Sequence, residues 1–140
     1  MKIVVLGSGS KGNSTVIKLE NHNILIDVGF SYNKMKENLE QINLKPKDIN
    51  FILITHDHSD HIKGLETFLK NNNTLLYVSE KISKKYDFLK KYDNKRNLND
   101  IETKEYKIKI IPASHDATDT KGFLIESDES LVYLTDTGYV

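Results

Sequence analysis

The chain has 140 residues, of which 38% are hydrophobic; this fits one domain with a buried core and excludes a disordered protein. Its 20 basic and 20 acidic side chains give zero net charge, so any binding of nucleic acid would depend on a local patch rather than an overall field. No apolar run is longer than four residues. Such runs are far too short for a membrane span or a secretion signal, so we expect a cytoplasmic protein that does not contact membranes.

The first half of the sequence shows mainly strand patterns. Continuous or alternating apolar residues predict four strands, the first and the last of them buried, and Asn21–Asn23 predicts the turn of a hairpin. Apolar residues at helical spacing from Tyr32 to Ile42 predict a helix, which Ser31 is placed to cap. The predicted strands are Lys2–Leu6, Thr15–Glu20, Ile24–Asp27 and Asn50–Thr55.

The second half begins with helices and ends with strands. One helix is predicted over Ile62–Lys70, and a second follows Ser79 and continues to Tyr92. The predicted strands are Thr74–Val78, Tyr106–Ile111, Gly122–Glu126 and Leu131–Thr135. Together the elements predict a layered α/β or α+β domain with polar residues gathered at the strand ends.

The glycine-rich segment Gly7–Gly12 matches the spacing G-x-G-x-x-G, and Asp27 lies 20 residues beyond Gly7. This pattern binds dinucleotides only where the third glycine opens a helix that receives the pyrophosphate. Here the following residues are β-branched and alternate, which is typical of a strand. We therefore interpret the segment as a tight turn that packs closely against a neighbour.

Histidines and acids cluster where predicted strands end. The segment His56–His61, with sequence His-Asp-His-Ser-Asp-His, directly follows a predicted strand; His115 and Asp136 follow two others. Side chains two apart in an extended chain face the same way, so His56 and His58 can bind one ion together. With no cysteine in the chain, a transition metal must be held by His, Asp or Glu. The repeated placement at strand ends favours a metal centre over a polar loop with solvated histidines.

Two other polar residues have different predicted roles. Asp27 ends its strand, and we expect its carboxylate to orient a metal-binding imidazole, the alternative being an ordinary strand-end aspartate. His22 lies in a turn, and we expect it to be exposed and without a functional role.

The segment Thr55–His61 resembles the HxHxDH motif of the metallo-β-lactamase superfamily. Further segments are similar to the WalJ/YycJ-like bacterial branch, in the same order along the whole chain. These are Gly7-Ser8-Gly9-Ser10-Lys11-Gly12-Asn13-Ser14, Ile24-Leu25-Ile26-Asp27-Val28-Gly29, His61-Ile62-Lys63-Gly64-Leu65, His115-Asp116-Ala117 and Leu134-Thr135-Asp136-Thr137-Gly138-Tyr139-Val140.

The resemblance implies an αββα sandwich with two divalent metal ions at the edge of two facing sheets. It implies that His56, His58 and His115 hold the first ion, that Asp60 and His61 hold the second, and that Asp136 bridges both. Asp60 and Asp136 are then the catalytic candidates, placed to orient the attacking water or accept its proton, and Asp27 supports the histidine segment. Zinc is the first expectation for the metal, with manganese or iron as alternatives.

The sequence departs from the superfamily pattern after Asp136, where no further histidine follows to complete the second metal site. We therefore expect residues 1–140 to be the N-terminal part of a single hydrolase domain that lacks its C-terminal half. The apolar face of the first sheet, with strands such as Ile3–Leu6, Phe51–Ile54 and Leu131–Leu134, would then lack its cover. We expect this apolar face to be covered either by self-association of the chain or by a complementary C-terminal half.

The resemblance implies a phosphodiesterase or nuclease that acts on DNA. Local support comes from residues 80–109, which carry ten of the 20 basic side chains together with Tyr86, Phe88 and Tyr92. One alternative is a thioesterase or lactonase of the glyoxalase II type, although the segment around His115 lacks the Thr-Pro-Gly-like stretch usual there. Another alternative is a catalytically inactive metal-binding fragment that needs a partner chain.

Overall fold

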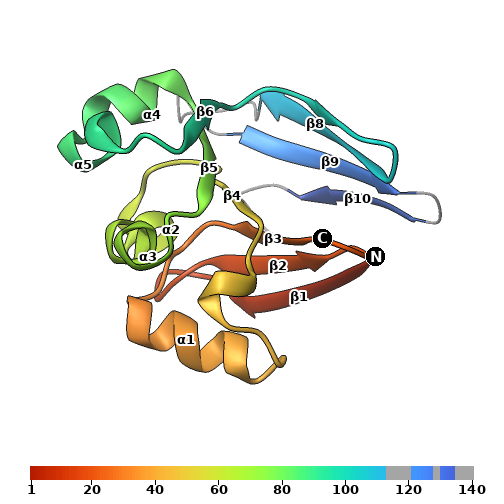
Figure 1. The fold of residues 1–140 in the computed structure, drawn as a ribbon, viewed down its shortest axis with the longest axis horizontal. Coiled ribbons are helices and arrows are strands. Elements are labelled where there is room, and N and C mark those ends of the chain that lie inside the picture. Colours follow the sequence, from red (N-terminus) through yellow and green to blue (C-terminus); the bar gives the residue numbers. More distant parts are fainter. Residues whose placement is uncertain (113–120, 128–129, 135–140) are drawn as a thin grey trace.

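The computed structural model describes residues 1–112, 121–127 and 130–134 and arranges them in three layers (Figure 1). A six-stranded sheet lies between a layer of helices and a second sheet of four strands. In spatial order the first sheet contains β1 (Lys2–Gly7), β2 (Ser14–Lys18), β3 (Asn23–Ile26), β4 (Phe51–Leu53), β5 (Leu75–Val78) and β6 (Lys95–Asn97). The second sheet contains β10 (Ser130–Leu134), β9 (Lys121–Ser127), β8 (Tyr106–Pro112) and β7 (Ile101–Glu102).

The first sheet changes direction at β3. Its strands β1, β2 and β3 are antiparallel, whereas β3, β4, β5 and β6 run parallel. The parallel strands therefore all end at the same edge, which we call the carboxyl edge. The turn between β1 and β2 lies there too, because β2 pairs antiparallel with β3. Residues 7–13, 27–30 and 55–61 thus meet at this edge.

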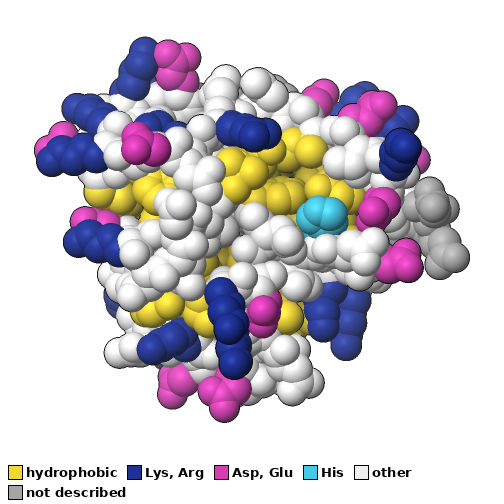
Figure 2. Space-filling view, viewed as in Figure 1, with side chains coloured by type: hydrophobic (Ala, Val, Ile, Leu, Met, Phe, Trp, Pro, Cys, Tyr) yellow, Lys and Arg dark blue, Asp and Glu magenta, His cyan; other side chains and the backbone are white. Residues whose placement is uncertain are grey.

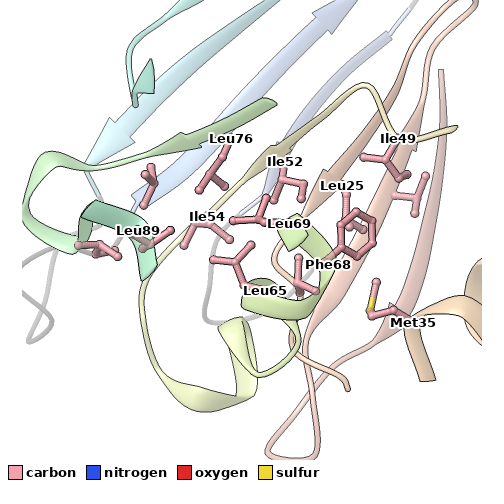
Figure 3. Packing of buried hydrophobic residues seen from close by; sticks show 14 of the residues in the cluster. Leu25, Met35, Ile49, Ile52, Ile54, Leu65, Phe68, Leu69, Leu76 and Leu89 are labelled. Atoms are coloured by element: carbon pink, nitrogen blue, oxygen red, sulfur yellow. The ribbon is translucent and has the colours of Figure 1, made fainter. Parts of the chain in front are cut away.

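The helices cover the outer face of the first sheet. They are α1 (Tyr32–Glu40), α2 (Ser59–Ile62), α3 (Leu65–Asn72), α4 (Glu80–Lys85) and α5 (Asp87–Lys91), with a short 3₁₀ helix η1 (Pro46–Asp48) before β4. Met35, Phe68 and Leu89 from these helices belong to one apolar cluster with Leu25, Ile52 and Leu76 of the sheet, as Figure 3 shows. Burial of these apolar side chains is the main stabilising contribution on this face.

The inner face of the first sheet packs against the second sheet. Side chains alternate along a strand, so Ile24 and Phe51 point away from the helices and toward Ile108 and Phe123 of the second sheet. All four are at most 5% exposed. The described part of the chain therefore has two apolar cores, one on each face of the first sheet.

Two expectations about the sheets were wrong. The first sheet does not lack its cover, because this chain itself supplies a second sheet, and Leu131–Leu134 belongs to that second sheet through β10. The strand at Lys2–Leu6 is not buried: β1 is an edge strand, on which Ile3 and Val5 are 38% and 46% exposed. Apolar composition alone cannot distinguish an edge strand from a central one.

Both helices predicted in the second half are interrupted. The helix expected over Ile62–Lys70 is divided into α2 and α3 around Gly64, where a Cβ atom would lie 2.0 Å from the carbonyl oxygen of Phe30. The helix after Ser79 is divided at Tyr86 into α4 and α5. The predicted caps are confirmed, because the Ser31 and Ser79 hydroxyls accept hydrogen bonds from the amides of Lys34 and Ile82. Within the described ranges, no helix is long and apolar enough to cross a membrane.

Candidate metal centre

The loop of residues 55–61, which we call the histidine loop, leaves β4 at the carboxyl edge and brings three histidines together. The ring centroid of His56 lies 4.5 Å from that of His58 and 3.8 Å from that of His61. His56 and His61 are buried, whereas His58 is exposed. One end of the cluster is therefore enclosed by the protein, and the other faces solvent.

Asp27, which directly follows the neighbouring strand β3, binds the histidine loop through its carboxylate. One oxygen of its carboxylate, Oδ1, accepts a hydrogen bond of 2.8 Å from the Thr55 amide; the other, Oδ2, lies 2.6 Å from the Thr55 hydroxyl and 2.6 Å from Nδ1 of His61. Asp27 is 1% exposed and has a left-handed backbone (φ 64°). Its contact with His61 is the one expected of a supporting carboxylate.

The hydrogen bonds fix which ring nitrogen carries the proton in both buried histidines. A carboxylate can only accept, so the single proton of the Thr55 hydroxyl goes to Asp27. The hydroxyl oxygen, 3.0 Å from Nδ1 of His56, must then accept from that nitrogen. Nδ1 of His61 likewise donates to Asp27. Both rings therefore keep the lone pair on Nε2, which is the form in which a neutral imidazole binds a metal ion.

Asp60 lies beside this pair of rings, with Oδ2 3.8 Å from Nε2 of His61. The same oxygen accepts a hydrogen bond of 2.9 Å from the side-chain amide of Asn13, in the turn between β1 and β2. Sequence reasoning missed the parts played by Thr55 and Asn13. Both residues stand within the motif segments, but nothing in the spacing indicates that their side chains contact the acids.

Asp57 connects the histidine loop to the junction of α4 and α5. Its Oδ2 accepts hydrogen bonds of 2.8 Å from both Lys85 Nζ and the Tyr86 hydroxyl. Burial raises the pKa of the Asp57 carboxyl, but the hydrogen bonds from Lys85 and Tyr86 outweigh burial and hold that pKa below its usual value. The carboxylate in turn raises the pKa of Lys85. Asp57 is therefore a charged anchor between two predicted metal ligands.

The donor types suit a divalent transition metal, with imidazoles and a carboxylate together at one edge of a sheet. Within the described ranges, no group of three His, Asp or Glu side chains could hold an ion by itself. Two predicted ligands, His115 and Asp136, lie outside the described residues. The ligand set expected from the sequence therefore combines four described side chains with two others.

His22 lies far from this cluster along the sheet, in the turn between β2 and β3 at the opposite edge. It is half-buried, with its ring centroid 5.4 Å from that of Tyr106 in an edge-to-face contact. The expectation that it is simply exposed was wrong, because the second sheet brings Tyr106 over the turn.

Comparison with known proteins identifies the family. The model of the metallo-beta-lactamase superfamily matches residues 7–139. The exodeoxyribonuclease WalJ of Streptococcus pneumoniae is 35% identical over 99% of this chain and 55% of its own length. The exodeoxyribonuclease YycJ of Bacillus anthracis is 30% identical over 97% of this chain and 54% of its own length. The chain therefore spans about half the length of these curated relatives.

The fold comparison agrees with the sequence comparison. The short form of human tRNase Z has a TM-score of 0.74 and 17% identity, with coverage of 100% of this chain and 71% of that chain. The shared arrangement includes the mixed α/β layers expected from the sequence. The matched family model and the shared fold together establish that this chain belongs to the metallo-beta-lactamase superfamily.

Proposed function

We propose that the chain forms the N-terminal part of a metal-dependent hydrolase domain that cleaves phosphodiester bonds in DNA. The observation that carries the proposal is the buried pair His56 and His61, whose Nδ1 atoms are engaged by Thr55 and Asp27 so that Nε2 of each ring suits a metal ion. Membership of the superfamily supports metal-dependent chemistry. The names of two relatives, both exodeoxyribonucleases, support DNA as the substrate.

The proposed site binds two divalent ions, with zinc as the first choice and manganese or iron as alternatives. One ion would be held by His56, His58 and His115 and the other by Asp60 and His61, and Asp136 would be a ligand shared by both. When bound, the ions supply Lewis acidity toward a phosphoryl oxygen and lower the pKa of an attacking water. Without a further histidine from elsewhere, the second ion is the weaker of the two.

The chain's own side chains then orient the reactants. The Asp60 carboxylate lies beside Nε2 of His61 and is only partly exposed, which suits a group that orients water or accepts its proton. Asp136 is proposed for the same role. His58 is exposed, so a bound substrate could reach it from solvent.

Contacts with the DNA backbone are proposed for α4 and α5. These helices carry five lysines against two acids, and the hydrogen bond from Lys85 to Asp57 brings their junction next to the histidine loop. Figure 2 shows lysine side chains beside acidic ones over this part of the surface, at its upper left. Tyr86 and Phe88, with ring centroids 6.0 Å apart, add aromatic surface that suits base stacking.

We also propose that a complementary segment or a second copy covers the exposed part of β1. Ile3 pairs with Ile17, whose side chain lies in the core between the sheets, so Ile3 and Val5 continue this inner apolar face. Size-exclusion chromatography with light scattering tests this, and replacement of Val5 by Lys is expected to abolish any association. A strictly monomeric parent chain would contradict cover by a second copy and would leave a complementary segment as the proposed cover.

The central experiment measures metal content and hydrolysis together. The chain is dialysed, loaded with zinc or manganese, and incubated with end-labelled single- and double-stranded DNA and, separately, with a thioester. DNA cleavage is expected from the complete domain, of which this chain forms the N-terminal part, and His58→Ala in that domain is expected to reduce it about 100-fold or more. The same assay on this chain alone shows whether the N-terminal part is active without the rest of the domain. His22→Ala is the matched control, because it removes the histidine at the opposite edge of the sheet.

Each contrary result has a distinct meaning. Thioester hydrolysis without DNA cleavage would indicate that the same site belongs to a thioesterase and not to a nuclease. Metal binding without either reaction would favour an inactive metal-binding module. Cleavage that survives His58→Ala would overturn the assignment of the site.

A further inference from the structure

Asn13 makes an unusually complete set of contacts at the carboxyl edge. It is 5% exposed, and its side-chain nitrogen donates to Oδ2 of Asp60 at 2.9 Å and to the Gly9 carbonyl at 2.8 Å. Its side-chain oxygen accepts from the Gly9 amide at 3.0 Å. Its backbone amide donates to the Asp60 carbonyl at 2.7 Å, and its own carbonyl accepts from the Gly29 amide at 3.0 Å. Both the backbone and the carboxylate of Asp60 are thus held by one residue.

The contacts require an amide side chain at this position. Asn13 must donate to an acid and a carbonyl while it accepts from an amide, and only a side chain with both an NH₂ group and a carbonyl oxygen does so. An aspartate of the same size would place a second carboxylate against Asp60 and would lose both donated bonds. Gly9, which makes two of these hydrogen bonds, has a positive φ of 105°. Only glycine adopts this backbone conformation at little cost in free energy.

The hydrogen bond from Asn13 determines the orientation of the Asp60 carboxylate. Without it, the partly exposed side chain would be free to rotate toward solvent. With it, Oδ2 stays 3.8 Å from Nε2 of His61, the nitrogen assigned to the second metal ion. A carboxylate that is already oriented loses less conformational entropy when an ion binds.

We propose that Asn13 is a positioning residue that acts through Asp60 on the affinity for the second metal ion. The inference rests on the proposed function, since it takes Asp60 and His61 as ligands. It also gives a role to the glycine-rich turn: the turn presents Asn13 to the metal centre instead of binding a nucleotide.

The test is a double-mutant cycle of metal affinity. Cobalt(II) affinity is measured by competition with a chromogenic chelator for the parent chain, Asn13→Ala, Asp60→Asn and the double variant, and the cobalt absorption spectrum reports the coordination geometry. We expect Asn13→Ala to weaken binding of the second equivalent about 10- to 100-fold and to change its spectrum. In the Asp60→Asn background the same change should have less than a twofold effect.

Thermal melting of each variant separates positioning from folding. If Asn13→Ala does not fold, Asn13→Ser replaces it in the cycle, because it removes the side-chain amide without placing a second carboxylate against Asp60, and the same loss is expected. Affinity within twofold of the parent, or an equal loss with and without the Asp60 carboxylate, would overturn the positioning role alone. Failure of the parent chain to bind any cobalt would overturn the proposed metal centre and the role of Asn13 with it.

Discussion

The Tyr86 hydroxyl lies 2.8 Å from Oδ2 of Asp57, so the point where α4 ends and α5 begins is connected directly to the histidine loop. Asp57 stands between His56 and His58, and its carboxylate therefore limits the movement of both neighbours. The Asp57–Tyr86 contact links the basic helices to the candidate metal centre, although the two residues are 29 positions apart in the sequence.

Tyr86→Phe removes this hydrogen bond and leaves the ring. We expect it to lower the free energy of unfolding by about 1 kcal/mol and to speed amide hydrogen exchange in the histidine loop, because one anchor of Asp57 is lost. Urea unfolding and exchange monitored by mass spectrometry measure the two effects. Lys84→Met is the control, since it breaks an exposed ion pair with Glu80 that does not involve the loop. Unchanged exchange in the loop after Tyr86→Phe would show that the contact does not order it.

Gly29→Ala is expected to destabilise the carboxyl edge severely. A Cβ atom at Gly29 would lie 2.0 Å from the Asp60 carbonyl oxygen and 2.4 Å from the Asn13 amide nitrogen. Both are backbone atoms and no side-chain rotation can relieve the overlap, so we expect a loss of about 3 kcal/mol in denaturant unfolding. Gly9→Ala is the comparison, because a Cβ there meets nothing within 4 Å and the cost is only that of its left-handed backbone, about 1–2 kcal/mol. Equal losses for the two variants would contradict the predicted crowding.

Phe123→Ala tests whether the second sheet covers the first. Phe123 is fully buried between the sheets, and its truncation is expected to lower the free energy of unfolding by about 3–5 kcal/mol. Its neighbour Leu124, half-buried on the other face of β9, provides the control, and Leu124→Ala should cost less than about 1.5 kcal/mol. A loss below about 1 kcal/mol for Phe123→Ala would mean that the second sheet is not packed as described.

Tyr92 predicts an alkaline effect on stability. Burial raises the pKa of its hydroxyl to about 12 from the usual 10.0, and the hydroxyl donates to the Thr74 carbonyl. Because the folded state favours the protonated phenol, this contribution is complete below pH 10 and is lost as the pH rises toward 12. We therefore expect the stability difference between the parent and Tyr92→Phe to shrink over that interval. A difference that is constant from pH 9 to pH 12 in urea titrations would contradict the raised pKa.

Strand positions followed well from the sequence, whereas interruptions of helices did not. The strands that contain Ile24 and Phe51 consist mainly of apolar residues, so each could be predicted from its own local sequence. The break at Gly64, by contrast, reflects the close approach of the Phe30 carbonyl, which is a tertiary contact. The strand Lys95–Asn97 has no apolar pattern in its sequence, and it forms because it pairs with the neighbouring strand β5. Such features depend on neighbours that are distant in sequence.

The same distinction applies to the candidate site. His56, His58 and His61 stand together in one short segment, so their proximity could be predicted from spacing. The roles of Thr55 and Asn13 depend on hydrogen bonds to acids that lie 28 and 47 positions away. Only the fold brings these partners together.

The parallel half of the first sheet also provides attachment points for reporter groups. The connections that enter β3, β4 and β6 lie at the edge opposite the histidine loop, and Glu20, Lys47 and Asp93 are exposed within them. The chain contains no cysteine, so one cysteine introduced at any of these positions would be the only reactive thiol. A fluorophore placed there can report on folding or on DNA binding without occupying the edge where the proposed chemistry takes place.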